Sequence, residues 1–473
     1  MSRHTASVLI PAPQCMKKIA GKLPVKKLTA FRIVPELSSI SAYLEKVFAV
    51  LGLKVGKTAE NAVINFKYAP MTDGAWQMTV TPEGITATAG DLRGASYAAN
   101  ALAQMLFAAT IKSLPDDALN CAEIADEPRF QWRGFMLDSA RHYQDKEFVK
   151  KFLRILSVFR INSFHWHLVD SQGWRYPSKH ASKLDKKGLW SVGQYTLDDL
   201  REVSQCARDL GIRIIPEVDV PGHSRIMLAN YPEYSCNPEK PGAEFCIGNP
   251  DTMKFIKNIF SELMEIFPDS PYIHVGGDEA ATDNWEACPV CRKAMENKGF
   301  SSMRELENDF MVELTRFIIS KGRTPIIWGT CSGQVYPADT IIQVWLDIRE
   351  PLKVIPNGNK IIYSVHNSLY FDYPANMDEP WETWMFELSE KGVYMTDPYI
   401  IWPEKVKDAT LGTEACLWTE TIPQHRVLAK LFPRISAYSE CAWSMPENKS
   451  WHDFQRRKEL LEAAGYFDYV KNL

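Results

Sequence analysis

The segment PYIHVGGDE, residues 271–279, places two adjacent carboxylates directly after a short apolar run. Its first half is typical of a buried strand, and the two glycines allow a sharp turn where that strand ends. Asp278 and Glu279 each raise the cost of ionising the other, so one of them tends to stay protonated near neutral pH. A protonated carboxyl suits an acid that protonates a leaving group. An isolated acidic pair is usually a solvated turn, but the glycines and His274 favour a functional site.

The same design, an apolar strand followed by polar residues, recurs along the chain from Pro128 onward. Helix-like stretches separate the strands, among them residues 146–160, 197–210, 252–266 and 303–321. This alternation indicates parallel β/α units, and eight such units fit a (β/α)8 TIM barrel. The predicted strands are residues 134–138, 163–170, 212–219, 272–276, 325–328, 340–345, 360–364 and 412–418.

The chain before this region mixes strand-like and helix-like segments in a different pattern. Such a grouping suggests a small α+β domain. The segments concerned are the strands at residues 62–68, 77–80 and 84–89 and the amphipathic helices at residues 39–51 and 92–106.

We therefore predict a protein of the α/β class with two domains. A small α+β domain, residues 1–126, precedes a (β/α)8 barrel, residues 127–473. Residues 367–408 are irregular and rich in Trp and Tyr. We expect them to form a loop region over the mouth of the barrel.

Nearly every predicted barrel strand ends in residues that can do chemistry. In a TIM barrel the C-terminal ends of all strands meet at one face, which is where active sites of this fold lie. A convergent set of acids, one Arg, one His and several aromatics forms a polar-tipped pocket with aromatic walls, as expected for a sugar site. The set consists of Asp138, Arg141, Asp170, Asp219, His223, Asp278, Glu279, Trp328, Trp345, Tyr370, Trp418 and Glu420.

Composition narrows the choice of partner. The formal net charge of -4 gives no electrostatic reason to expect nucleic acid or an anionic membrane surface. No run of 18 apolar residues is present, so we expect no membrane span. The 14 Trp residues favour carbohydrate, because flat sugar faces stack on aromatic rings. Whether the protein forms a homo-oligomer is left open.

The first residues do not have the pattern of a secretory signal. The only apolar stretch among them, residues 6–11, is short and interrupted by proline. We therefore expect a cytoplasmic protein, unless a signal precedes this numbering. The ten cysteines are compatible with free thiols in a reducing compartment.

Cys288 and Cys291 form a CxxC spacing, with Cys236 and Cys246 upstream. These four residues have the ligand chemistry of a structural zinc site. A disulfide and unpaired buried thiols are the simpler interpretations, because the two pairs lie far apart in sequence and only one has the tight spacing. We expect no cofactor and no catalytic metal.

Five segments in order make the sequence resemble glycoside hydrolase family 20, the β-N-acetylhexosaminidases, over almost its whole length. They are RGFMLDSARHY at residues 133–143, HWHLVD at 165–170, EVDVPGH at 217–223, HVGGDE at 274–279 and WTE at 418–420. The resemblance implies the same small α+β domain before the barrel. Its substrate would be a glycan or glycoconjugate.

The resemblance also implies a mechanism without a protein nucleophile. Most retaining glycosidases place two carboxyls about 5 Å apart on opposite sides of the anomeric carbon, and this family is a substrate-assisted exception. Glu279 would act as general acid and then as general base. Asp278 would orient the substrate's acetamido N–H, and Tyr370 would hold the acetamido oxygen. His223 with Asp219 would set the charge on Glu279.

The remaining site residues are implied to bind the sugar. Arg141 would hold the hydroxyls at C3 and C4, and Asp372 and Glu420 would reach C4 and C6. Asp170 would have a supporting or sugar-binding role. The aromatic walls would come from Trp328, Trp345, Trp418 and, from the mouth loop, Trp384 or Trp381.

Two rival interpretations and one departure from the family pattern accompany this prediction. Ser171 stands where the family usually has a second acid, which puts substrate preference in doubt. A lectin-like barrel without catalysis is disfavoured because Asp278, Glu279 and Tyr370 are all present. Release of a disaccharide, as by a lacto-N-biosidase, needs a wider pocket than one closed by Asp372 and Glu420.

Overall fold

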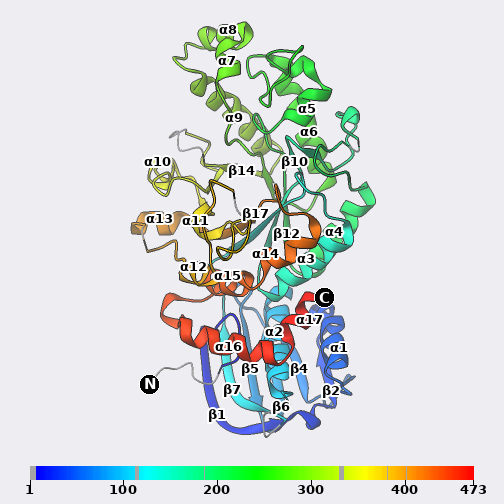
Figure 1. The fold of residues 1–473 in the computed structure, drawn as a ribbon. Coiled ribbons are helices and arrows are strands. Elements are labelled where there is room, and N and C mark those ends of the chain that lie inside the picture. The colour runs from blue at the N-terminus through cyan, green and yellow to red at the C-terminus, as the bar shows by residue number, and fades with distance from the viewer. Residues whose placement is uncertain (1–6, 112–116, 186, 330–334, 381, 401) are drawn as a thin grey trace.

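The computed structural model describes residues 7–111, 117–185, 187–329, 335–380, 382–400 and 402–473. Within them the chain forms an open seven-stranded sheet followed by a closed barrel of eight strands. The N-terminal sheet lies below the barrel in the view of Figure 1. The predicted fold class, a TIM barrel preceded by a smaller domain, is confirmed.

The barrel strands are all parallel and pair in the order β12-β13-β14-β15-β16-β17-β8-β9. β8 closes the ring by pairing with β17 on one side and β9 on the other. Because these strands are buried on both faces, most of them are rich in apolar residues, which made them recognisable in the sequence. Their bounds are β8 Trp132–Asp138, β9 Ser163–His167, β12 Arg213–Glu217, β13 Tyr272–His274, β14 Thr324–Trp328, β15 Ile341–Val344, β16 Ile361–Tyr363 and β17 Thr410–Leu417.

Amphipathic helices cover the outside of the barrel. In α3 the side chain of Asp145 accepts a hydrogen bond from the Phe148 N–H (2.8 Å), and Val149, Phe152 and Leu156 pack inward. The larger barrel helices are α3 Lys146–Val158, α4 Leu197–Asp209, α6 Pro250–Ile266, α9 Met303–Ser320, α14 Gln424–Leu431 and α15 Arg434–Trp443.

Shorter elements occupy the loops. β10 Val169–Asp170 and β11 Gly173–Trp174 form a small antiparallel pair directly after β9. The other short elements are α5 Arg225–Asn230, α7 Asp283–Ala287, α8 Pro289–Asn297, α10 Pro351–Val354, α11 His366–Leu369, α12 Glu390–Met395 and α13 Glu404–Ala409.

The N-terminal sheet has the order β1-β7-β5-β6-β4-β2-β3 and mixes parallel with antiparallel pairs. Helices α1 Ser41–Val50 and α2 Leu92–Ala109 pack with it, and α2 is almost wholly buried. Three of these strands were predicted. The bounds are β1 Cys15–Pro24, β2 Ala30–Ile33, β3 Gly56–Lys57, β4 Ile64–Tyr68, β5 Trp76–Thr81, β6 Gly84–Ala89 and β7 Ala118–Asp126.

The C-terminal helices α16 Trp451–Ala463 and α17 Tyr466–Lys471 return to the N-terminal sheet (Figure 1). The hydroxyl of Tyr466 donates to Asn100 Oδ1 on α2 (2.9 Å). The rings of Phe107 and Tyr466 lie 5.3 Å apart between centroids. The two ends of the chain therefore share one packed interface beneath the barrel.

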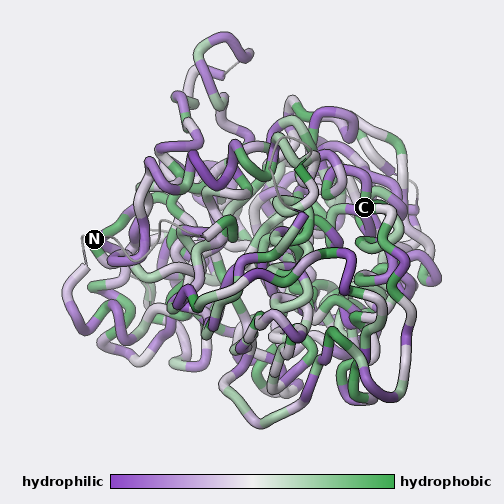
Figure 2. The backbone as a smooth tube through the Cα atoms, turned by 90° about the horizontal axis from the view of Figure 1, so that it is seen from below, coloured by the Kyte–Doolittle hydropathy of each residue, from purple (hydrophilic) through white to green (hydrophobic). Residues whose placement is uncertain are grey.

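Hydrophobic and hydrophilic stretches alternate along the chain, as the colours of Figure 2 show. This alternation is expected where helices and strands bury one face and expose the other. Among the described residues, no helix is both long and apolar enough to cross a membrane.

Candidate active site

The C-terminal ends of the barrel strands surround a cavity of about 310 Å³. Ten of the 13 residues predicted for the site line this cavity. Three predicted residues, Asp170, Asp219 and Trp328, do not. The lining residues are Arg141, His223, Asp278, Glu279, Trp345, His366, Tyr370, Asp372, Tyr373, Trp384, Trp418 and Glu420.

The turn after β13 presents the two acids through an unusual backbone. Gly276 and Gly277 adopt φ angles of +72° and +100°, and a Cβ atom at Gly276 would overlap the Asp219 carboxyl. Only glycine combines this conformation with so close an approach. Glu279 itself lies in the left-handed region with φ +51°. Such conformations in non-glycine residues are strained and cluster at functional sites.

Asp278 is buried at the cavity wall, with 7% of its surface exposed. Burial raises the pKa of this carboxyl, and the charge of Glu279 raises it further, against the opposing effect of His223. Its Oδ1 atom is buried and has no hydrogen-bond partner among the described residues. The raised pKa expected from the adjacent acids therefore belongs to Asp278.

Glu279 differs from Asp278 both in its exposure and in the direction of its pKa shift. Its side chain is 59% exposed, and its Oε2 lies 3.5 Å from His223 Nε2. The hydrogen bond from His223 lowers the pKa of Glu279, and the charge of the imidazolium adds to that effect. In the free protein His223 thus favours the ionised form of Glu279.

His223 is held by Asp170, and this corrects the predicted pairing with Asp219. The Nδ1 atom of His223 lies 3.2 Å from Asp170 Oδ1. Asp219 instead accepts a hydrogen bond from the Gly277 N–H (3.1 Å) and is 1% exposed. Although burial lowers the pKa of His223, the carboxylates of Asp170 and Asp219 raise it well above its ordinary value. Asp219 therefore supports the turn beneath the acids.

Asp170 is fully buried behind the cavity, which favours the supporting role over the sugar-binding role predicted as its alternative. Its oxygens are occupied by Arg141 (2.8 Å), His223 and His167 (2.9 Å). Burial would raise the pKa of Asp170, but Arg141 and then His223 outweigh it and lower the pKa. The carboxylate thus orients the two cations that do line the cavity.

Arg141 points into the cavity from the segment after β8. Besides the ion pair with Asp170, its Nε donates to Gln172 Oε1 (3.0 Å) and its Nη2 lies 3.8 Å from Glu420 Oε1. The guanidinium carbon is 5.1 Å from the centroid of the Trp418 ring, a cation–π distance. This arrangement fixes Arg141 and leaves buried Nη1 without a hydrogen-bond acceptor among the described residues.

Tyr370 and Asp372 follow β16 and α11 and form another wall. Both are at least nine-tenths buried. Burial raises the pKa of the Tyr370 hydroxyl well above its ordinary value, so the hydroxyl remains a hydrogen-bond donor. Burial and then the charge of Glu420 raise the pKa of Asp372. The Asp372 Oδ1 atom is buried without a partner in the described chain.

Three lining residues thus hold buried polar atoms that have no hydrogen-bond partner within the described parts of the protein. Such atoms are costly unless a ligand or water satisfies them. The set comprises donors and acceptors on different sides of one cavity, which suits a ligand with many hydroxyl and amide groups. The atoms are Arg141 Nη1, Asp278 Oδ1 and Asp372 Oδ1.

The aromatic walls are partly as predicted. Trp345 and Trp418 line the cavity, and Trp384, 59% exposed, lies at its rim. Trp328 was predicted to line the cavity but is buried at 1% exposure, 5.8 Å from the Trp418 ring between centroids. Its Nε1 donates to Glu217 (2.8 Å). The alternative candidate Trp381 lies outside the described residues.

A buried polar network, centred on Glu217, lies beneath the cavity and was not predicted from the sequence. This carboxylate lies 2.9 Å from both His165 Nε2 and His274 Nδ1, and it also bonds His167. Burial would raise the pKa of Glu217, but these histidines lower it well below its ordinary value. The three histidines are hydrogen-bonded inside the barrel, as expected for residues that support the site.

Two lining residues, His366 and Tyr373, were also missed. Their side chains are hydrogen-bonded to each other, 2.8 Å between His366 Nδ1 and the Tyr373 hydroxyl. Tyr373 belongs to the Trp/Tyr-rich region, residues 367–408, that was predicted to cover the barrel mouth, and His366 directly precedes that region. That enrichment was the available signal, but it does not single out individual residues.

One possible ligand atom from each of His223, Asp278 and Glu279 lies within 4.8 Å of the other two, so these three lining residues have the spacing of a metal site. A metal would need His223 as a neutral ligand. Asp170 and Asp219, however, raise the pKa of His223 despite its burial, which favours the imidazolium. The cluster is therefore better suited to moving protons than to holding a cation.

Two models of glycosyl hydrolase family 20 match the chain. The model of the catalytic domain matches residues 130–446, and the model of domain 2 matches residues 6–127. Together they span both parts of the fold.

Individual relatives agree with these matches. A beta-hexosaminidase of Akkermansia muciniphila is 31% identical over 81% of this chain and 82% of its own length. A beta-hexosaminidase of Porphyromonas gingivalis is 30% identical over 82% of this chain, which spans 53% of that longer protein. The structure of an exo β-N-acetylglucosaminidase from Vibrio harveyi, in complex with N-acetylglucosamine, superimposes with a TM-score of 0.88 at 26% identity, covering 100% of this chain and 79% of that one.

Proposed function

Because the chain belongs to glycosyl hydrolase family 20 and is a glycoside hydrolase of the β-hexosaminidase type, we propose that it removes terminal β-linked N-acetylglucosamine or N-acetylgalactosamine from glycans. The reaction proceeds with retention, through an oxazolinium intermediate formed by the substrate's own 2-acetamido group. The observation that carries this proposal is that Asp278, Glu279 and Tyr370 line one cavity in which Glu279 is the most exposed carboxylate.

The size of the cavity supports release of one sugar at a time. A volume of about 310 Å³ is at the small end of ligand pockets, which range over about 300–1,000 Å³. Arg141, Asp372 and Glu420 also line this cavity and bind the hydroxyls of the terminal sugar. A chain end fits such a pocket, whereas the middle of a glycan chain does not.

In the first step the acetamido oxygen attacks the anomeric carbon while the bond to the glycosidic oxygen breaks. Glu279 donates its proton to that departing oxygen, so the leaving group departs as a neutral alcohol. Asp278 accepts a hydrogen bond from the acetamido N–H and stabilises the positive charge that develops on the ring. Tyr370 donates to the acetamido oxygen and holds it in line for attack.

In the second step water opens the oxazolinium ring. Glu279, now a carboxylate, removes a proton from the attacking water, and the anomeric carbon regains its β configuration. Closing the cycle restores the proton on Glu279 and the neutral acetamide of the released sugar. No protein atom bonds covalently to the substrate, so one exposed carboxyl suffices where other retaining glycosidases need two.

The substrate range is tested by comparing 4-nitrophenyl β-glycosides of N-acetylglucosamine, N-acetylgalactosamine and a β-linked disaccharide such as lacto-N-biose. We expect release of 4-nitrophenol from one or both monosaccharides and at least about tenfold lower kcat/KM for the disaccharide, a difference of about 1.4 kcal/mol. Dominant release from the disaccharide would contradict exo action on single sugars. Absence of release from all three, with binding retained, would point to a lectin-like barrel.

The pH profile gives a second test, through His223→Asn. Asparagine is neutral and tolerates the left-handed backbone that His223 adopts with φ +48°. Loss of the imidazolium removes an influence that lowers the pKa of both Glu279 and Asp278. Both pKa values therefore rise, and both limbs of the kcat/KM profile are expected to move to higher pH.

The matched control for this experiment is His425→Asn, on the exposed surface of α14. Its pH profile should coincide with that of the unmodified protein. If the limbs of the His223→Asn profile stay in place or move to lower pH, the assignment of His223 as the group that lowers both pKa values is wrong.

A further inference from the structure

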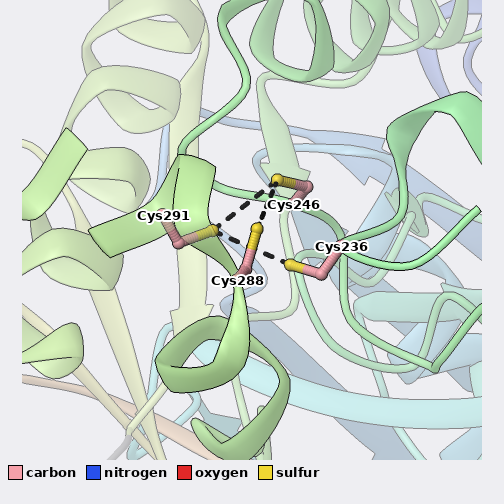
Figure 3. A group of neighbouring side chains, drawn as sticks. All are labelled: Cys236, Cys246, Cys288 and Cys291. Carbon is pink, nitrogen blue, oxygen red and sulfur yellow. Dashed lines mark hydrogen bonds between the residues drawn. The ribbon is translucent and has the colours of Figure 1, made fainter. Parts of the chain in front are cut away.

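Four cysteines from two separate loops meet outside the active site (Figure 3). Sγ–Sγ distances are 3.6 Å between Cys246 and Cys291, 3.7 Å between Cys236 and Cys291, and 3.9 Å between Cys246 and Cys288. All four sulfur atoms lie within 4.8 Å of one another. The fold thus brings the two pairs of cysteines together in space, although their separation in sequence disfavoured a common site.

These Sγ–Sγ distances match those expected for four thiolates that bind one metal ion in a tetrahedral arrangement. Zinc binds cysteine sulfur at about 2.3 Å, which places the sulfur atoms of a regular tetrahedron about 3.8 Å apart. A disulfide needs two sulfur atoms at about 2.05 Å, and the described cysteines are all unbridged. We propose that Cys236, Cys246, Cys288 and Cys291 bind one structural zinc ion.

The surroundings favour a structural ion over a catalytic one. Cys246, Cys288 and Cys291 are each at most 4% exposed. Four protein ligands fill the coordination sphere of zinc and leave no position for water or substrate. The two segments are also in backbone contact, since a Cβ atom at Gly248 would lie 2.6 Å from Cys291 Cα. The ion would therefore sit in a closed site between packed loops.

The zinc ligands join two loops that carry active-site residues. Cys236 and Cys246 lie on the segment between β12 and α6, which also carries His223. Cys288 and Cys291 lie at the start of α8, in the loop that follows Asp278 and Glu279. Because His223 and Glu279 must stay about 3.5 Å apart, the relative position of these loops matters for the active site.

Hydrogen bonds connect the cysteine cluster with the turn that carries His223. The Phe245 N–H donates to the Pro221 carbonyl (2.9 Å), and the Ser224 N–H donates to the Ala243 carbonyl (2.8 Å). From the other loop, the buried indole of Trp285 donates to the Phe245 carbonyl (2.8 Å). Zinc would thus hold the two loops together at a distance from the substrate and position the acid and its histidine.

The direct test is the metal content of the full-length protein, purified without chelators or added zinc and measured by inductively coupled plasma mass spectrometry. We expect about one zinc per chain and a native mass that exceeds the denatured mass by one zinc ion. Cys291→Ser removes the ligand that contacts both Cys236 and Cys246. Its zinc content should fall close to zero, and its thermal unfolding midpoint should fall by several degrees.

The matched control is Cys206→Ser, a half-buried cysteine of α4 outside the cluster, which should retain full zinc content. Replacing zinc by Co²⁺ in the unmodified protein should give the intense visible absorption of a tetrahedral cobalt–thiolate centre. Wild-type protein with no bound metal, with iron in place of zinc, or with disulfides among these four cysteines would overturn the proposal. These measurements on unmodified protein remain decisive if Cys291→Ser does not fold.

Discussion

Replacing Glu279 by glutamine is expected to lower kcat/KM for a glycan substrate by about 10²–10⁴-fold, the usual contribution of general acid–base catalysis. Glutamine keeps the shape of the side chain and the backbone strain at this position, but it has no proton to give to the glycosidic oxygen. The side chain is 59% exposed in the free protein. A bound sugar would cover it, and the resulting loss of water would raise the pKa of Glu279 towards that of an effective acid.

The leaving group separates a catalytic defect from a structural one. For an aryl glycoside with a very acidic phenol, bond cleavage needs little protonation, so the first step of Glu279→Gln should be almost as fast as in the unmodified protein. For an alkyl or sugar leaving group, kcat/KM of Glu279→Gln should show the full decrease of about 10²–10⁴-fold. Glu286→Gln, an exposed change on α7, should have no effect on either substrate. Equal loss for both leaving groups would argue against Glu279 as the acid.

Replacing Asp278 by asparagine is expected to cost about 10²–10³-fold in kcat, comparable to the loss of one preorganised group that stabilises transition-state charge. The amide cannot offset the positive charge that develops on the acetamido group. The pKa of Asp278 is raised by burial, and this carboxyl must be ionised to act. Activity of the unmodified protein is therefore lost as the pH falls through that raised pKa, and this limb should disappear in Asp278→Asn.

Asp283→Asn provides the control for this change, because Asp283 is an exposed acid at the start of α7. It should leave kcat and the pH profile unchanged. If Asp278→Asn retains at least about a tenth of wild-type kcat, which corresponds to less than about 1.4 kcal/mol, electrostatic stabilisation by Asp278 is not a major part of catalysis.

The barrel was predictable from the sequence, whereas four of the seven strands of the N-terminal sheet were not. Barrel strands such as β8 are buried at every position and end in polar residues, so both their extent and their common direction are visible in the sequence. β1, in contrast, has only Leu23 fully buried among its ten residues. It lies at the edge of its sheet and pairs with β7 alone. Such a strand has no apolar pattern from which it could be recognised.

The composition of the cavity was largely predictable, but the pairing of its charges was not. Asp170 and Asp219 both follow barrel strands and both lie close to His223. The direction of each side chain depends on the turn that follows its strand: Asp170 pairs with Arg141, whereas Asp219 accepts a hydrogen bond from the Gly277 N–H. The sequence contains no signal that assigns a partner to each carboxylate. The prediction that Trp328 lines the cavity was wrong for the same reason, because its indole turns inward and donates a hydrogen bond to Glu217.

The most direct test of the mechanism varies the nucleophile that the substrate supplies. Aryl β-N-acetylglucosaminides with zero to three fluorines on the acetyl group share one leaving group and differ mainly in the electron density of the acetamido oxygen. If that oxygen attacks the anomeric carbon, kcat/KM should fall with every fluorine, by at least about tenfold over the series, or about 1.4 kcal/mol. A kcat/KM that is independent of fluorination, or equally fast hydrolysis of the aryl β-glucoside without any acetamido group, would contradict substrate-assisted catalysis.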